Sequence, residues 1–75
     1  MQEISKEFVS RAVVEYVKKQ KNTENVDVAI VEKQIDGWVV RGTCPIDLEG
    51  HKWAEKFSAA VDLKGKIQAV NYALL

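Results

Sequence analysis

Reactive side chains crowd into one short segment, which holds Cys44, Asp47, Glu49 and His51. A thiol, two carboxylates and an imidazole can bind a divalent ion, but their spacing matches no established ligand motif. The acidic residues also suit a turn, because they bond nearby backbone amides. Cys44 as a nucleophile needs a base, and His51 is the sole histidine. We expect Cys44 to face Trp53 in an apolar setting that makes a thiol unreactive, so the sequence predicts no enzyme, metal or cofactor.

Glu55 is a charged residue on a strand face that is otherwise apolar. Its predicted neighbour across the hairpin is Gly42, which leaves room for a side chain or a ligand. A buried carboxylate is costly unless it is paired, and its pKa rises. Two interpretations stay open. Glu55 lies at an uncovered rim or bonds Tyr16, or it lines a small-ligand cup between helix and sheet with Tyr16, Tyr72 and Gly42.

Three cations fall on the opposite face of the predicted sheet, in one row across adjacent strands: Lys33, Arg41 and Lys56. Like charges directly opposite one another destabilise a sheet. The row is therefore either a solvated surface relieved by Glu32, or a site for an anion such as phosphate, nucleic acid or an acidic partner. A different register of the first hairpin would place Arg41 opposite Glu32 and dissolve the row.

The same outer face carries small or apolar residues that a two-layer fold leaves open. They are Val31, Val39, Ala54, Ser58, Ala60, Ala69 and Ala73. Solvent-facing strands tolerate such residues, but a flat face of this kind can also pack against a second copy. A homodimer through this face is one expectation.

The elements that position these residues follow from the spacing of the apolar side chains. A helical stripe precedes a two-residue alternation, and its members are Ile4, Phe8, Val9, Ala12, Val13, Tyr16 and Val17. Ser5 is the expected N-cap, and the polar segment 22–25 ends the helix. Three turn signals, at 36–37, 49–50 and 64–65, then separate four strands. The sequence predicts an α+β fold, with one N-terminal helix packed on a four-stranded antiparallel meander, cystatin-like in broad architecture.

Apolar pairing predicts the registers of the hairpins. In the last hairpin Phe57 should face Tyr72, and Ala59 should face Val70. In the middle hairpin, a turn centred on 48–49 puts Val40 opposite Phe57.

For the first hairpin we weigh two registers. A two-residue loop at 36–37 puts Val28 and Ile30 on the wrong face. A loop of odd length, or a bulge, puts Ile30 beside Cys44 and Val28 beside Ile46, and we prefer it.

Composition limits the classes of protein. The chain has 75 residues and reads as one domain, 1–75, which buries only about 60% of its unfolded surface. Eleven basic and eleven acidic residues give no net charge, which argues against a dedicated nucleic-acid binder. One cysteine forms no internal disulfide. No apolar run spans a membrane and the N-terminus does not resemble a signal peptide, so we expect a cytoplasmic protein.

Residues of the second half also match a family pattern in order. They are Gly37-Trp38, Pro45, Phe57, Val61-Asp62, Gly65 and Tyr72. The pattern resembles the GvpO type of gas-vesicle accessory protein, and VDLKGKIQAV is similar to the end of PepSY-type domains. Neither family has catalytic residues to transfer. The resemblance implies an accessory or interaction domain, and we expect a protein partner bound through the open sheet face.

Overall fold

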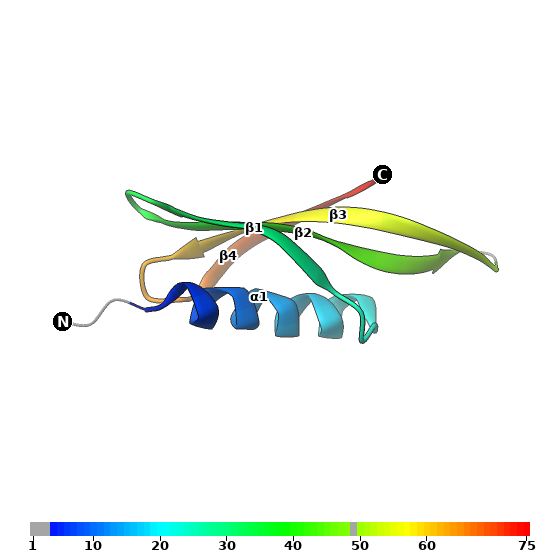
Figure 1. Cartoon of the computed structure of the whole chain (residues 1–75), viewed down its shortest axis with the longest axis horizontal. Helices are drawn as coiled ribbons and strands as arrows, with labels where there is room; N and C mark the ends of the chain where they lie inside the picture. Colours follow the sequence, from blue (N-terminus) through cyan, green and yellow to red (C-terminus); the bar gives the residue numbers. More distant parts are fainter. Residues whose placement is uncertain (1–3, 49) are drawn as a thin grey trace.

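The computed structural model describes residues 4–48 and 50–75. Helix α1 (Lys6–Lys21) precedes the strands β1 (Asp27–Gln34), β2 (Gly37–Leu48), β3 (His51–Asp62) and β4 (Ile67–Leu74). The strands form one antiparallel sheet in the order β1-β2-β3-β4, and α1 crosses one of its faces (Figure 1). The structure therefore confirms the predicted α+β fold of one helix followed by a four-stranded meander.

Helix α1 begins and ends at residues that complete its backbone hydrogen bonding. The Ser5 hydroxyl accepts a hydrogen bond from the Phe8 N–H at 3.0 Å, which confirms the predicted N-cap. Asn22 adopts the left-handed conformation (φ 52°), and the Thr23 N–H donates to the Lys18 carbonyl at 3.1 Å. Acidic and basic residues then occupy the ends of the helix that favour their charge.

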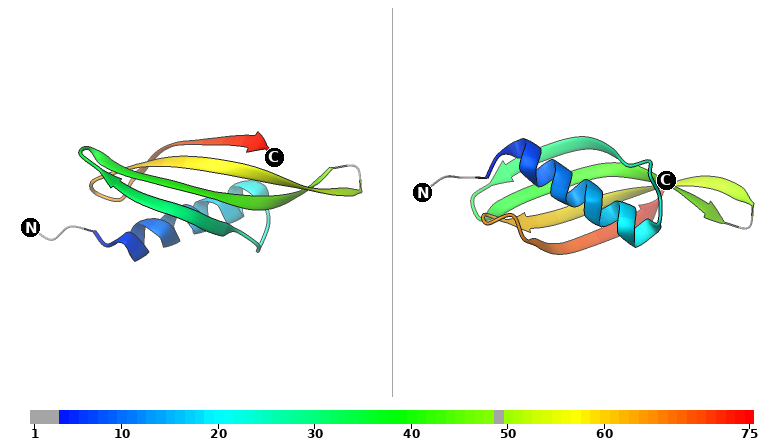
Figure 2. Two further views of the ribbon diagram at one scale, coloured as in Figure 1. Left: turned by 45° about the horizontal axis from the view of Figure 1, so that its top comes forward. Right: turned by 90° about the horizontal axis from the view of Figure 1, so that it is seen from below.

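The core lies between one stripe of α1 and the inner face of the sheet. Val9, Val13 and Val17 are spaced four residues apart and are fully buried. They pack on the inner side chains of β2 and β3, namely Trp38, Val40, Cys44, Phe57, Ala59 and Val61. The helix runs diagonally, from β1 at its start to β4 at its end (Figure 2). None of the described elements covers the opposite face of the sheet (Figure 1).

The β2–β3 hairpin extends beyond the end of the helix (Figures 1 and 2), and the molecule is 48 Å long but only 18 Å across. Both tryptophans lie in this hairpin, and Trp53 was predicted to face Cys44 in an apolar setting. Trp38 lies above α1 and is 8% exposed, whereas Trp53 is 51% exposed. Trp53 pairs with Ile46 beyond Glu55, where the helix has ended. The prediction is therefore wrong for Trp53, because one helix covers only part of a long hairpin.

The registers of the last two hairpins show where turn chemistry outweighs apolar pairing. Phe57 faces Tyr72 and Ala59 faces Val70, as predicted. In the middle hairpin the predicted register is wrong by two residues. Leu48 pairs with His51, which leaves Gly50 in the turn with φ 79°, a conformation that glycine adopts without strain. A shift of two residues preserves both faces but changes the neighbours: Phe57 now lies opposite Gly42.

Both registers considered for the first hairpin are wrong. Gln34 pairs with Gly37, so the two residues of the turn are Ile35 and Asp36. The turn therefore lies one residue earlier than the predicted turn at 36–37. A β-bulge at Ala29 then shifts the pairing between Val28 and Ile30. Because of this extra residue, Val31 packs against the core and Ile30 points away from it.

Gly42 allows β1 and β3 to approach β2 closely. A Cβ atom there would overlap the Asp27 carbonyl oxygen and lie 2.8 Å from Cζ of Phe57. We expect Gly42→Ala to lower the free energy of unfolding by about 3 kcal/mol, because overpacking forces the backbone to shift. Gly50→Ala is the control: it meets no atom within 4 Å, and its positive φ should cost about 1 kcal/mol. Urea unfolding measures both, and equal losses would contradict this packing.

Asp62 organises the turn between β3 and β4. Its Oδ1 accepts hydrogen bonds from the N–H groups of Lys64 and Lys66, both at 2.9 Å. Its Oδ2 accepts one from Gln68 Nε2 at 3.0 Å. These donors hold the pKa of the Asp62 carboxyl below its usual range, the Lys66 N–H contributing most.

Because of this turn, the stability of the protein should fall as the pH is lowered. Folding lowers the pKa of the Asp62 carboxyl. Its contribution to the free energy of unfolding is therefore present at neutral pH, and it is lost as the pH falls through the folded-state pKa. Asp62→Asn should lower the urea midpoint at pH 7 and flatten its fall in acid. Asp36→Asn is the control, since no described residue donates a hydrogen bond to that carboxylate. A midpoint that falls in acid as steeply in Asp62→Asn as in the wild type would refute the role.

Candidate functional site

A shallow depression of about 490 Å³ opens on the uncovered face of the sheet. All four strands contribute to its lining. The residues are Ala29, Arg41, Gly42, Thr43, Lys56, Phe57, Ser58, Asn71, Tyr72 and Ala73. No element among residues 4–48 and 50–75 covers this face, so the depression is open to a macromolecule as well as to a small molecule.

Two neighbouring rows of the ladder place the polar groups of the depression. Arg41 pairs with Ser58, which pairs with Asn71. The next row whose side chains point to the same face joins Thr43 to Lys56. Arg41 and Lys56 are therefore diagonal neighbours, roughly 7–8 Å apart at the backbone. The side chains between them are short, which keeps the floor of the depression low.

The depression is basic. Arg41 and Lys56 are exposed, and none of the described acidic side chains forms an ion pair with either. Thr43, Ser58 and Asn71 add neutral hydrogen-bonding groups to the same lining. Two cations beside amide and hydroxyl groups can bind a carboxylate or a phosphate.

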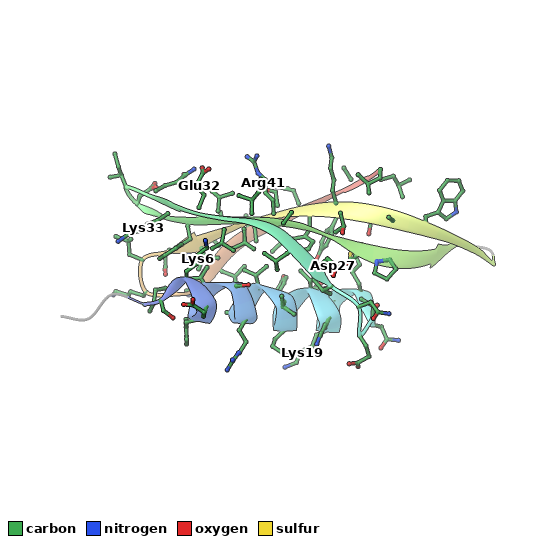
Figure 3. All side chains as sticks on the ribbon, viewed as in Figure 1. Lys6, Lys19, Asp27, Glu32, Lys33 and Arg41 are labelled. Carbon is green, nitrogen blue, oxygen red and sulfur yellow. The ribbon has the colours of Figure 1, made fainter. Side chains whose placement is uncertain are left out.

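The third predicted cation lies elsewhere. Lys33 is on the helix side of the sheet, with Nζ 5.9 Å from the ring centroid of Trp38. Figure 3 shows Lys33 and Arg41 on opposite sides of the sheet. The bulge at Ala29 causes the difference. Because of the extra residue, each later residue of β1 lies on the face opposite to the predicted one. The predicted row of three is wrong, and Arg41 and Lys56 remain together.

The inner face holds a second polar cluster, at the end of α1. Glu55 Oε1 is buried and lies 2.7 Å from Lys21 Nζ, so the ammonium compensates its charge although the two groups are not aligned as a hydrogen bond. The same Nζ lies 4.0 Å from the ring centroid of Tyr72. The buried hydroxyl of Tyr72 has no hydrogen-bond partner among the described residues. Lys21 was not predicted as part of a site, although a cation in the last helical turn was visible in the sequence.

This cluster differs from the predicted ligand cup. Glu55 and Tyr72 do come together, and Tyr16 lies near Tyr72, but the Tyr16 hydroxyl accepts from Gln20 Nε2 at 3.3 Å and not from Glu55. Gly42 lies opposite Phe57, whose ring occupies the space that the glycine leaves. Glu55 lies opposite Cys44 instead. The carboxylate has a partner in Lys21, and the room predicted beside Gly42 is filled.

Burial controls the two neutral ionisable groups of this cluster. It raises the pKa of the Cys44 thiol, and the nearby Glu55 charge raises it further while Lys21 opposes the rise. Burial likewise raises the pKa of the Tyr72 phenol, with smaller contributions from Tyr16, Cys44 and Glu55. Cys44 is therefore a protonated core thiol with little nucleophilic character.

A second open cavity, of about 480 Å³, lies between α1 and β1. Its lining combines both charges with apolar groups: Lys6, Glu7, Ser10, Arg11, Val14 and Val31. The mixed charge gives it no preference for an anion or a cation.

Metal binding was considered for Cys44, Asp47, Glu49 and His51. The side chains of the last three lie outside the described residues. Within the described part of the chain, no group of three or more His, Cys, Asp or Glu side chains is placed to hold a metal ion. None of the described helices is long and apolar enough to cross a membrane.

Comparison with known proteins finds no match for this chain among family models, curated proteins or solved structures. The resemblance to GvpO-type and PepSY-type domains therefore stays a prediction.

The ion pair beneath the sheet predicts a measurable coupling. Lys21→Met leaves a Glu55 carboxylate that is only 13% exposed without its cation, and should cost about 1–2 kcal/mol of unfolding free energy. Adding Glu55→Gln to the Lys21→Met variant should recover about 1 kcal/mol of that loss. A double-mutant cycle measures this interaction energy. Lys19→Met, in the same helical turn but exposed, controls for the helix dipole. Additive single effects would show that the pair contributes nothing.

Proposed function

We propose that this protein is a non-enzymatic binding domain whose open sheet face binds an acidic segment of a partner protein. The observation that carries the proposal is the depression around Arg41 and Lys56, in which two exposed cations have no ion pair with the described residues. A partner carboxylate would supply the missing negative charge.

The surroundings of the cations favour a macromolecular partner. On the same face, the row beside Arg41 joins Val39, Ala60 and Ala69. Their small apolar side chains allow a partner to approach the sheet closely over a flat area. Thr43, Ser58 and Asn71 can hydrogen-bond a peptide backbone or side chain. An apolar floor with a few polar anchors is typical of protein-binding surfaces.

A second copy of the chain is a less favourable occupant of this face. In a two-fold dimer the same patch lies on both subunits, so the contact would bring two copies each of Arg41 and Lys56 together. Like charges at such a contact are repulsive unless an anion is trapped between them. We therefore prefer a partner of opposite charge to the homodimer expected from the small side chains.

Nucleic acid is the second candidate, because phosphate suits the same cations. It is supported by Arg41 and Lys56 alone, since Lys33 lies on the other face. The chain also has no net charge, which gives little attraction for a polyanion. We rank it below an acidic protein segment.

A titration with amide-resolved NMR tests the proposal. A short glutamate-rich peptide should shift the amides that line the depression, and Arg41→Glu or Lys56→Glu should each weaken its affinity about fivefold to tenfold. Lys19→Glu is the matched control, because it makes the same charge change on the far side of α1 (Figure 3).

Three outcomes would count against the proposal. One is an equal loss of affinity in Lys19→Glu, which would mean binding by overall charge alone. Another is tighter binding of a single-stranded oligonucleotide than of the peptide at the same ionic strength, which would favour nucleic acid. The third is the absence of any shift on this face.

A further inference from the structure

The two edges of the sheet are protected to different degrees. β1 carries Asp27, Glu32 and Lys33 and is interrupted by the bulge at Ala29. Charges and bulges of this kind prevent an edge strand from pairing with another chain. β4 has the sequence IQAVNYAL, with no charged residue and no proline. Its register with β3 shifts once, at the start of the strand between Ile67 and Ala69, and is regular from Ala69 to Leu74.

The backbone of β4 presents hydrogen-bonding groups to its free side. The Leu75 N–H donates to the Ala54 carbonyl at 3.1 Å, so Leu75 turns its N–H toward β3. Backbone groups alternate along an antiparallel strand, so Val70, Tyr72 and Leu74 turn theirs away from β3. Because β4 is the last strand of the sheet, no described strand pairs with these groups.

Aromatic side chains of α1 flank this edge. Phe8 is 53% exposed, and its ring lies over the β3–β4 turn, where a Cβ on Gly65 would come within 2.8 Å of it. Tyr16, also exposed, lies near Tyr72 at the other end. Ile67 and Val70 are only half buried beneath them. A strand added to β4 would place alternate side chains against this aromatic flank.

The exposed charges around β4 are basic. Lys56, on β3, and Lys64 and Lys66, in the β3–β4 turn, are exposed and form no ion pair with the described residues. The two acidic residues of β3 are already engaged, Glu55 by Lys21 and Asp62 by its turn. An incoming strand that carries acidic residues therefore meets complementary charge at Lys56 and at the β3–β4 turn.

We propose that β4 accepts an extended peptide segment of a partner protein as a fifth strand, with apolar residues toward α1 alternating with acidic residues toward the open face. Strand addition of this kind takes its affinity from main-chain hydrogen bonds and its specificity from alternate side chains. The proposal goes beyond the depression, because it involves the backbone of the edge and not Arg41.

A second copy of the chain fits this edge poorly. Pairing two β4 strands about a two-fold axis at Tyr72 brings the ends of both α1 helices together, since each helix ends beside its own Tyr72. Lys18 and Lys19 of the two copies would then lie close to one another. A separate acidic strand avoids this repulsion.

Hydrogen exchange of the intact protein tests the proposal, with a short end-blocked peptide of alternating Glu and Val as the probe. At saturating peptide, we expect exchange of the Val70, Tyr72 and Leu74 amides to slow at least tenfold. The matched control is the same peptide N-methylated on the residues whose N–H groups would face β4. It keeps every side chain but loses those hydrogen bonds, and it should give no protection.

Variants separate this edge from the depression. Leu74→Pro removes one outward N–H at the exposed end of the strand and should weaken the peptide severalfold more than Leu74→Ala does. Arg41→Glu should leave the edge protection in place, so the edge and the depression can fail independently.

Equal protection by the N-methylated peptide would overturn the proposal, as would shifts without slowed exchange at these three amides. Protection that rises with protein concentration alone would also overturn it, because the occupant would then be a second copy.

Discussion

The structure depends on one packing contact, between the stripe Val9, Val13 and Val17 of α1 and the inner face of the sheet. With a single helix, a four-stranded sheet can bury only one of its faces, and only along the length of that helix. The outer face and the far end of the β2–β3 hairpin are therefore left exposed. The half-exposed Trp53 and the open depression are both consequences of this limit.

The bulge at Ala29 determines how charge is divided between the faces. Without it, Ile30 would share the inner face with Val28, and Lys33 would join Arg41 outside. With it, Val31 fills the core and Lys33 lies beside Trp38. One extra residue in an edge strand thus strengthens the core and protects that edge. It also reduces the basic cluster of the outer face to Arg41 and Lys56.

Much of the fold was predictable because it follows from periodicity. The change from a helical to a two-residue repeat gave the element order, and apolar alternation gave the faces of β2, β3 and β4 correctly. Registers were harder, because a shift of two residues keeps every side chain on its face and leaves the apolar pattern unchanged. The bulge left no separate mark on the sequence, and so the face of Lys33 was wrong. Glu55 meets Lys21 because the helix crosses the sheet diagonally and ends beside β3 and β4. The spacing of residues along the chain does not predict this crossing direction.

A net charge of zero conceals an unequal distribution of paired and unpaired charges. Lys21 reaches under the sheet to compensate Glu55, which lets a carboxylate occupy the inner face. Asp62 is occupied by the amides of its own turn. Two acidic groups near β4 are thus engaged internally, whereas Lys56 and Lys66 keep their charges exposed. The side of the molecule with the least protected strand edge is therefore also the side with surplus positive charge, and the same segment of chain carries both properties.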